Sequence, residues 1–298
     1  MGKKYISSFN YNDIFGLLFI ILFLSLFFIL YKYLQTKNKN YLIINIIIFS
    51  FIVILINIKP IIFLYSLSSL ISCITYTPEF LSLKDYFPNH VLFENTESFS
   101  LLKMEVTNML LNTNQCKEIT LTKDTYSGEN SYIGSDIKIV SNEIRGWRIL
   151  NIKVGNIYSP DSIHFPHLVN LLDKTPEIKS CVISILEPGI HIPMHVGYYK
   201  GILRYMIPTH VPKEREKVFL ELNGIKYNWT EGKGVLWDDT FCHQVYNNSD
   251  ENRIVVYMDI IRPLGIFNKL NNYILNLVSH SKIVKEEIQR TEIKVKIK

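Results

Sequence analysis

The stretch Ser184-Ile-Leu-Glu-Pro-Gly-Ile-His-Ile-Pro-Met-His195-Val-Gly197 decides the fold of this chain. Its first residues belong to an apolar run that begins at residue 180, and the Glu-Pro-Gly sequence breaks that run. A short apolar run bounded by turn residues indicates a β-strand. A second stretch, Trp237-Asp-Asp-Thr-Phe-Cys-His243, is followed by the β-rich run Arg253-Ile-Val-Val-Tyr-Met-Asp259. We therefore expect residues 180–263 to form a β-rich core that contains both histidines.

Short strands separated by turns are expected throughout this core. Asn223-Gly224 indicates a two-residue hairpin, because asparagine and glycine accept the positive φ angles that such a turn needs. Proline cannot continue a strand ladder, so Arg262-Pro263 should end the sheet. Regularly spaced short strands are typical of a β-sandwich or jelly roll. The expected strands lie at residues 145–154, 180–186, 202–207, 218–222, 225–229, 232–237 and 253–260.

The first quarter of the chain is much more apolar than the rest. Residues 14–31 carry no charge, and a helix of ~20 such residues spans the ~30 Å hydrocarbon core of a bilayer. Tyr31-Lys-Tyr-Leu follows where a cleaved signal peptide would carry small residues, so we expect a retained span rather than a signal peptide. A buried core helix is the alternative. Lys59-Pro60 should interrupt the apolar block that follows, because proline removes a helix hydrogen bond.

Residues 1–76 are thus expected to form a membrane anchor that makes the protein an integral membrane protein, with the domain that follows at the membrane surface. The side of the membrane stays open, because Lys32, Lys37 and Lys39 favour one orientation while Lys3 and Lys4 favour the other. The anchor should contain two or three hydrophobic segments at about residues 14–34, 41–58 and 60–76.

Composition excludes several other classes of protein. The net charge of +5 is scattered along the chain, whereas a nucleic-acid groove needs clustered basic residues, so we expect no nucleic-acid partner. The four cysteines lie far apart without a CxxC pair, which argues against a disulfide scaffold and a zinc finger.

Helices are expected on both sides of the β core. Residues 97–111 have apolar positions at helical spacing, and residues 112–136 are a polar loop, which is either a lid or a surface insertion. Residues 264–298 begin as an amphipathic helix and end as a basic tail. A basic amphipathic helix that lies on a membrane is the alternative to an ordinary terminal helix there.

Two histidines are the candidate metal ligands. Imidazole suits divalent iron, and strands of a jelly roll can bring His195 and His243 together across the barrel mouth. The alternative is that both are structural. Iron oxygenases usually add a carboxylate two residues after the first histidine, and this chain has Gly197 there. Asp238 and Asp239 are candidate acceptors that orient the imidazole rings. The remaining candidates, His164, His167, His191 and His210, are assigned structural or surface roles.

Three further residues are candidates for binding an anionic co-substrate. Arg253 either forms a structural salt bridge or anchors a dicarboxylate through a bidentate pair. Ser184, on the strand that leads to His195, can add a hydrogen bond. Arg204 can hold a second carboxylate or the substrate.

These motifs resemble the aspartyl/asparaginyl β-hydroxylase family over about residues 93–263. The resemblance implies a branch of the iron(II)/2-oxoglutarate dioxygenases, which use O2, and an α+β domain at residues 77–263 built on a double-stranded β-helix, or jelly roll, with flanking helices. The family has only two histidine ligands, which at the matching positions are His195 and His243. Arg253 and Ser184 would bind 2-oxoglutarate, and Arg204 the cofactor or the substrate.

Two questions stay open at this point. The family typically has a histidine two residues after the motif arginine, and this chain has Met206, which cannot donate a hydrogen bond. The protein is therefore either an active hydroxylase or a membrane-tethered module that binds metal and 2-oxoglutarate with reduced activity. Some members hydroxylate Asp or Asn in peptides, whereas membrane-embedded bacterial members hydroxylate the acyl chain of lipid A. The apolar N-terminus and the ending Asp259-Ile-Ile-Arg-Pro263 are similar to the second kind, so the substrate is a peptide or a lipid.

Overall fold

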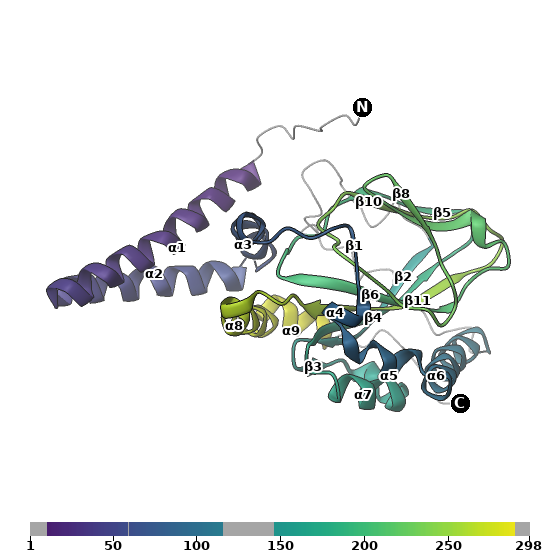
Figure 1. The fold of residues 1–298 in the computed structure, drawn as a ribbon. Helices are drawn as coiled ribbons and strands as arrows, with labels where there is room; N and C mark the ends of the chain where they lie inside the picture. The colour runs from purple at the N-terminus through teal and green to yellow at the C-terminus, as the bar shows by residue number, and fades with distance from the viewer. Residues whose placement is uncertain (1–10, 59, 116–145, 290–298) are drawn as a thin grey trace.

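The structure of the chain, a computed structural model, describes residues 11–58, 60–115 and 146–289. Figure 1 shows two facing sheets, a group of helices beneath the larger sheet, and a separate arm made of the first two helices. The predicted loop at residues 112–136 and the end of the C-terminal tail lie mostly outside the described residues.

The strands form one seven-stranded and one four-stranded antiparallel sheet within the described residues. The large sheet has the order β1-β9-β6-β11-β4-β2-β3, and the small sheet has the order β5-β10-β7-β8. The strands are β1 Phe80–Leu81, β2 Trp147–Val154, β3 Ile157–Tyr158, β4 Ile178–Leu186, β5 Ile190–His195, β6 Ile202–His210, β7 Val218–Leu222, β8 Ile225–Asn228, β9 Val235–Trp237, β10 His243–Asn247 and β11 Arg253–Ile261.

Strands β4 to β11 cross back and forth between the two sheets. Strands β4, β6, β9 and β11 belong to the large sheet, and β5, β7, β8 and β10 belong to the small one. This interleaving is the double-stranded β-helix, so the predicted jelly roll is confirmed by the strand order itself. The hairpin turn is confirmed as well, because Asn223 and Gly224 have φ angles of 49° and 83°. Strand β11 ends at Ile261, directly before Arg262-Pro263, as expected.

The helices cover the outer face of the large sheet and extend beyond it (Figure 1). The α-helices are α1 Tyr11–Thr36, α2 Lys39–Ile58, α3 Pro60–Ile74, α4 Leu83–Tyr86, α5 Val91–Glu94, α6 Thr96–Gln115, α7 Pro166–Asp173, α8 Asn268–Ser279 and α9 Lys282–Ile288. The short 3-10 helices are η1 Pro88–His90, η3 Pro160–His164, η4 Arg215–Lys217 and η5 Gly265–Phe267. Helix α6 contains the helix expected at residues 97–111.

Two apolar cores hold the β domain together. The first lies between the large sheet and helices α5 to α7, where Phe93, Leu102 and Leu168 pack on Ile183 and Ile207. Each such side chain contributes roughly 1.5–3 kcal/mol when it is fully buried. The second lies between the two sheets and contains residues such as Met206, Leu220, Trp237, Val245 and Val255. This inner core leaves the polar residues of the candidate site inside the barrel.

The predicted membrane-spanning helices are not supported. Within the described residues, no helix combines the length and the apolar character that crossing a bilayer requires. The break at Pro60 contributes, because it leaves α3 with only 15 residues. At 1.5 Å per residue, α3 is ~22 Å long, which is shorter than the ~30 Å hydrocarbon core.

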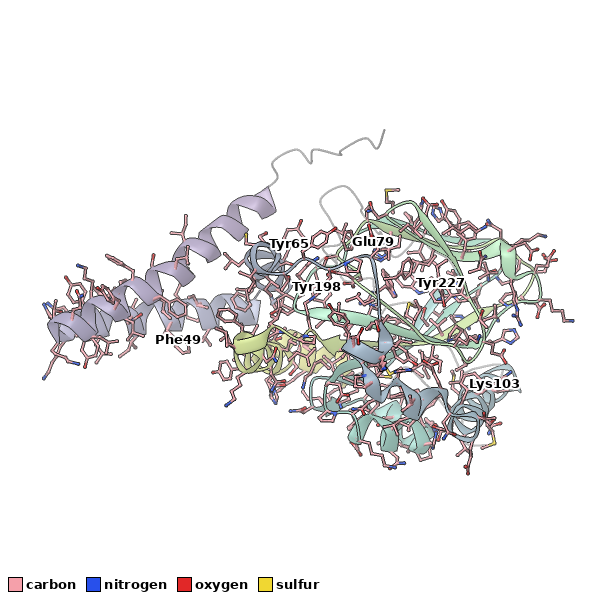
Figure 2. All side chains as sticks on the ribbon, in the orientation of Figure 1. Phe49, Tyr65, Glu79, Lys103, Tyr198 and Tyr227 are labelled. Atoms are coloured by element: carbon pink, nitrogen blue, oxygen red, sulfur yellow. The ribbon has the colours of Figure 1, made fainter. Side chains whose placement is uncertain are left out.

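Helices α2 and α3 instead use part of their apolar surface to pack on the β domain. Ile52 of α2 and Phe63 and Leu67 of α3 form a buried cluster with Tyr199 and Ile274. Figure 2 labels Tyr65 of α3 and Tyr198 in this region, and it shows Phe49 on the arm formed by α1 and α2, away from the sheets. The N-terminal helices are therefore joined to the part of the domain that follows His195.

Candidate active site

The fold brings the two predicted metal ligands together. His195 ends strand β5, His243 begins strand β10, and the two residues face each other in the antiparallel register of these strands. Their ring centroids lie 4.0 Å apart, with 55° between the ring planes. His243 is 2% exposed, and its ring meets that of Trp237 edge to face at 4.7 Å. The predicted pair is thus a real feature of the barrel interior.

Backbone carbonyl groups fix both imidazole rings. The Nδ1 atom of His195 lies 2.7 Å from the carbonyl oxygen of Pro193, and Nδ1 of His243 lies 2.8 Å from that of Phe241. A carbonyl oxygen only accepts hydrogen bonds, so each Nδ1 carries the proton and each Nε2 keeps a free lone pair. The sequence suggested that Asp238 and Asp239 orient the imidazole rings, and this is wrong. Each ring is oriented by the backbone carbonyl group of the residue two positions before the histidine.

Burial keeps both histidines neutral. Desolvation is the main cause that lowers the pKa of His195 to about 4; the hydrogen bond to Pro193 opposes this shift, and the nearby Arg204 guanidinium adds to it. Desolvation, followed by the proximity of His195, holds the pKa of His243 well below its ordinary value. Neutral imidazole is the form that binds metals. Two adjacent neutral rings with free Nε2 atoms therefore fit a divalent transition metal.

Within the part of the chain that the structure describes, no third protein ligand lies beside the histidine pair. Among the described residues, no group of three His, Cys, Asp or Glu side chains is arranged to hold a metal ion. Cys242, next to His243, is a free thiol that is partly exposed. A metal bound here would have to complete its coordination with water or with a co-substrate.

The carboxylate of Asp239 occupies the space beside Gly197. A Cβ atom added to Gly197 would lie 2.3–2.4 Å from the carboxylate atoms of Asp239, far inside contact distance. The Gly197 amide also donates a hydrogen bond of 2.6 Å to the Asp239 carbonyl oxygen. Gly197 stands at the position that usually supplies the third iron ligand. The carboxylate of Asp239, which belongs to another loop, leaves no room for a side chain at this position.

Asp239 is buried and only half satisfied. Its Oδ2 atom pairs with Arg204 at 3.1 Å, and its Oδ1 atom has no hydrogen-bond partner. Desolvation raises the pKa of Asp239 to about 6, although Arg204 lowers it. A buried acceptor without a partner is costly, so Oδ1 has capacity left to accept a hydrogen bond from a group bound in the barrel. The sequence offered no signal that separates Asp239 from Asp238, which instead pairs with Lys200 and Arg262.

We expect Gly197→Ala to destabilise the protein by roughly 1–3 kcal/mol, because the added methyl group meets the Asp239 carboxylate. In a chain that already carries Asp239→Gly, the same Gly197→Ala change should cost much less, because the clashing atoms are gone. Urea unfolding of the two single variants and the double variant measures the coupling between the positions. Strictly additive losses would contradict the steric account.

Arg253 is a buried guanidinium without an acidic partner among the described residues. It begins strand β11, is 1% exposed, and lies with its charged carbon 5.7 Å from the centre of the Trp229 ring. Its Nε and Nη1 atoms have no hydrogen-bond partner. Desolvation alone lowers the pKa of Arg253 to about 9. An unpaired buried charge is so unfavourable that these donors indicate a site for an anion, and a guanidinium binds carboxylates in a bidentate manner.

Strand register places Ser184 and Met206 on the same inner wall as Arg253. Ser184 lies opposite Val255, two residues along β11 from Arg253 on the same face. The indole Nε1 of Trp147 donates a 3.1 Å hydrogen bond to the Ser184 hydroxyl. Met206 lies opposite Tyr257, and it packs in the core between the sheets. The thioether of Met206 is thus part of the wall that runs from Arg253 towards Arg204.

Arg204 is held by two carboxylates in this structure. Its Nη2 atom pairs with Asp239 at 3.1 Å and with Asp259 at 3.0 Å, and its Nε atom donates to Asp259 at 3.1 Å. The guanidinium also lies 4.8 Å from the centre of the Tyr257 ring. Arg204 therefore lies beside the histidine pair but, unlike Arg253, already has partners for its charge.

The other histidines lie outside this pair. His191 is exposed on strand β5, where its ring stacks on Tyr246 at 4.1 Å. His167 bonds to Ser98, and His210 approaches Glu251 at 3.7 Å. These contacts agree with the structural and surface roles expected for them.

Comparisons with known proteins match the same part of the chain. The sequence pattern of the family described as aspartyl/asparaginyl beta-hydroxylase matches residues 96–263. The chain is 30% identical over 156 residues to the ornithine lipid ester-linked acyl 2-hydroxylase of Rhizobium tropici, and this match covers 52% of the chain and 55% of that protein. It is 33% identical over 103 residues to the aspartyl/asparaginyl beta-hydroxylase of Homo sapiens, which covers 33% of the chain and 13% of that protein. The matches thus span about half of the first relative and a small part of the second.

A solved oxidoreductase of the 2OG-Fe(II) oxygenase family from Burkholderia pseudomallei is 14% identical, with a TM-score of 0.32 over 41% of this chain and 72% of that one. A score this low carries no argument, so the fold assignment rests on the strand order. The family match is different, because it spans more than half of the chain and includes both histidines and both arginines of the site. The chain belongs to the aspartyl/asparaginyl beta-hydroxylase family.

Proposed function

We propose that this protein is an iron(II)- and 2-oxoglutarate-dependent dioxygenase that uses O2 to hydroxylate its substrate. The observation that carries the proposal is the buried, unpaired guanidinium of Arg253 inside the same barrel as the paired imidazoles of His195 and His243. A neutral imidazole pair fits iron(II), and the orphaned guanidinium donors fit one carboxylate of a dicarboxylate.

Bound iron(II), with 2-oxoglutarate as the electron donor, would let O2 supply the oxidising power that hydroxylation of a carbon requires. The chain's own residues perform the binding and the orientation. His195 and His243 present Nε2 atoms that the carbonyl bonds hold in place, and Arg253 with Ser184 would fix the far carboxylate of 2-oxoglutarate. Asp239 would accept a hydrogen bond from a water or a substrate group beside the metal, since its Oδ1 atom lacks a partner. Apolar residues such as Met206 and Val255 keep bulk water out of this space.

A lipid acyl chain is the substrate class that we favour. The relative named for an ornithine lipid covers more of this chain than the relative named for aspartyl and asparaginyl residues. Helices α1 and α2 also expose many large apolar side chains, including Phe28, Ile47 and Ile54. Contiguous apolar surface of this kind is typical of sites that contact membranes or proteins. We propose that these helices hold the catalytic domain at a lipid bilayer, where acyl chains are available.

An Asp or Asn side chain in a peptide is the second candidate. It is supported by the 33% identity to the human enzyme within the family region. The two substrates differ in what they need from the protein, because a peptide reaches the site from solution whereas an acyl chain must come from a lipid surface.

The direct test is succinate formation from 2-oxoglutarate by the full chain with added iron(II), measured with ornithine lipid vesicles and, separately, with Asp- and Asn-containing peptides. We expect succinate in step with a lipid product that is heavier by one oxygen atom, and little product from the peptides. A hydroxylated peptide without hydroxylated lipid would replace the first substrate by the second. Absence of succinate under every condition, including the slow reaction without substrate, would reject the dioxygenase.

A membrane-tethered binding module is the alternative that Met206 supports, because a thioether cannot donate the hydrogen bond that the family histidine offers. Such a module would bind iron(II) and 2-oxoglutarate tightly and produce no succinate in the same assay. Succinate production by the unmodified chain therefore decides between the module and the enzyme.

A further inference from the structure

The helices that lie outside the family-matched residues meet at one place. Helices α2, α3 and α8 all fall before residue 96 or after residue 263, so none belongs to the matched region. Ile52, Phe63 and Ile274 nevertheless pack into one buried cluster, together with Tyr199 and Ile202 of the catalytic domain. These additions to the family domain are thus built around the segment that joins β5 to β6.

That segment is the one that follows the first metal-ligand candidate. The Lys200 amide donates a 2.6 Å hydrogen bond to the Ser68 hydroxyl of α3. The Tyr199 hydroxyl donates to the Oδ1 atom of Asn271 on α8 at 2.7 Å, and Nδ2 of Asn271 donates to the Gly201 carbonyl at 2.8 Å. Hydrogen bonds therefore fix helices α3 and α8 to residues 199–201, which follow Gly197 closely in the sequence.

Helix α8 has a second apolar face that the domain does not cover. Leu270 and Tyr273 of α8 are exposed, and Ile266 of the preceding 3-10 helix η5, which is 91% exposed, continues their spacing. Leu277 continues this stripe and packs against the buried cluster of α2 and α3. The stripe is therefore continuous with the apolar surface of the N-terminal helices, and Figure 1 shows α8 directly beside the arm that they form.

The charge next to the stripe is basic. Helix α8 contains Lys269 and no Asp or Glu, and Lys285 is exposed on α9, whereas Lys282 of α9 pairs with Glu286 at 3.7 Å. An apolar stripe flanked by lysines matches the interface of a bilayer, where apolar side chains enter the acyl region and lysines meet anionic headgroups. The lysines would repel a basic protein surface. They would also repel the lysines of a second copy of the same stripe.

We propose that the outward stripe of η5 and α8, formed by Ile266, Leu270 and Tyr273, is a lipid-contact surface that holds the β domain against a bilayer. The proposal rests on the proposed function in so far as it assigns the bilayer as the source of the substrate. It adds a contact that the N-terminal helices do not make, and it explains why α8 is bonded to the segment beside the histidine pair.

The test places a nitrobenzoxadiazole fluorophore on Leu270→Cys in the full chain. Cys73, Cys116 and Cys242 are replaced by serine in this chain, and its melting temperature must match that of the unmodified protein. Leu101→Cys is the control, because Leu101 is 39% exposed and Leu270 is 41% exposed, each on a helix. Leu101 lies on α6, at the opposite end of the domain from the N-terminal arm (Figure 1).

Vesicles of phosphatidylcholine and phosphatidylglycerol, with and without doxyl-labelled lipid, provide the measurement. We expect blue-shifted emission and quenching by doxyl lipid at position 270, and neither change at position 101. A blue shift at position 270 without doxyl quenching would mean that a second copy or another protein covers the stripe, and it would overturn the proposal. An unchanged spectrum at position 270 would overturn it as well.

The quenching result does not depend on turnover, so its failure is distinguishable from failure of the proposed function. Leu270→Glu adds a functional readout: the KM for vesicle lipid should rise roughly tenfold, because a carboxylate replaces a membrane-inserted side chain. Succinate formation without substrate should stay unchanged, since α8 does not contact the histidine pair. Leu101→Glu should leave both quantities unchanged.

Discussion

His195→Ala and His243→Ala should each lower the affinity for iron(II) by more than ~100-fold and abolish succinate formation. The effect is large because these two rings are the only histidine ligands that the described site offers, and even groups outside a metal's ligand set cost ~10- to 100-fold when they are removed. Anaerobic equilibrium dialysis of the full chain measures the affinity directly, and succinate formation measures the consequence.

His191→Ala is the matched control, because His191 lies on the same strand as His195 but is exposed and stacks on Tyr246. It should bind iron(II) as the unmodified protein does. Iron affinity that falls equally in His191→Ala, or that survives in both His195→Ala and His243→Ala, would contradict the assignment of the pair.

Arg253→Met should weaken 2-oxoglutarate binding roughly 30-fold or more while it stabilises the protein without ligand. Loss of a buried charged hydrogen-bond partner costs ~2–5 kcal/mol in binding, which is roughly 30-fold or more in affinity. The same change removes a guanidinium whose Nε and Nη1 atoms have no partner, and replacing buried charges by apolar side chains often stabilises a protein by roughly 1–4 kcal/mol. Urea unfolding without ligand and calorimetric titration with 2-oxoglutarate measure the two effects.

The opposite signs of these effects distinguish a ligand site from a structural arginine. Arg148→Met is the control, because Arg148 is partly exposed and pairs with Glu187 at 2.9 Å, so neither stability nor 2-oxoglutarate affinity should change by much. An Arg253→Met protein that is strongly destabilised and still binds 2-oxoglutarate would show that Arg253 supports the fold instead.

The jelly roll was predictable because its turns and apolar runs are local signals, and Asn223-Gly224 is the clearest of them. The strands that carry the histidines were not predicted. Strand β5 contains Pro193, which usually argues against a strand, but β5 is an edge strand of the small sheet, where a missing N–H group is tolerated. Strand β10 begins soon after the polar residues 238–240, so no apolar run in the sequence marks where it starts.

Pairing between distant segments explains what the sequence left out of the site. His195 and His243 were recognisable from their motifs, but the carbonyl bonds that fix their rings depend on local backbone geometry. Asp238 and Asp239 are neighbours in the sequence, but Asp238 pairs with Arg262 and Asp239 pairs with Arg204. These roles depend on how β6 and the end of β11 pack, which the sequence does not show. The membrane helices were expected from hydropathy alone, which does not register that Phe63 and Leu67 pack on the β domain.

Anomalous diffraction at the iron edge tests the central claim most directly. Crystals of the full chain grown without oxygen, with iron(II) and 2-oxoglutarate, should show one iron peak within bonding distance of Nε2 of both His195 and His243. Density for a carboxylate should lie against the Arg253 guanidinium in the same crystals. An iron peak at any other place, with the two imidazoles free, would contradict the account.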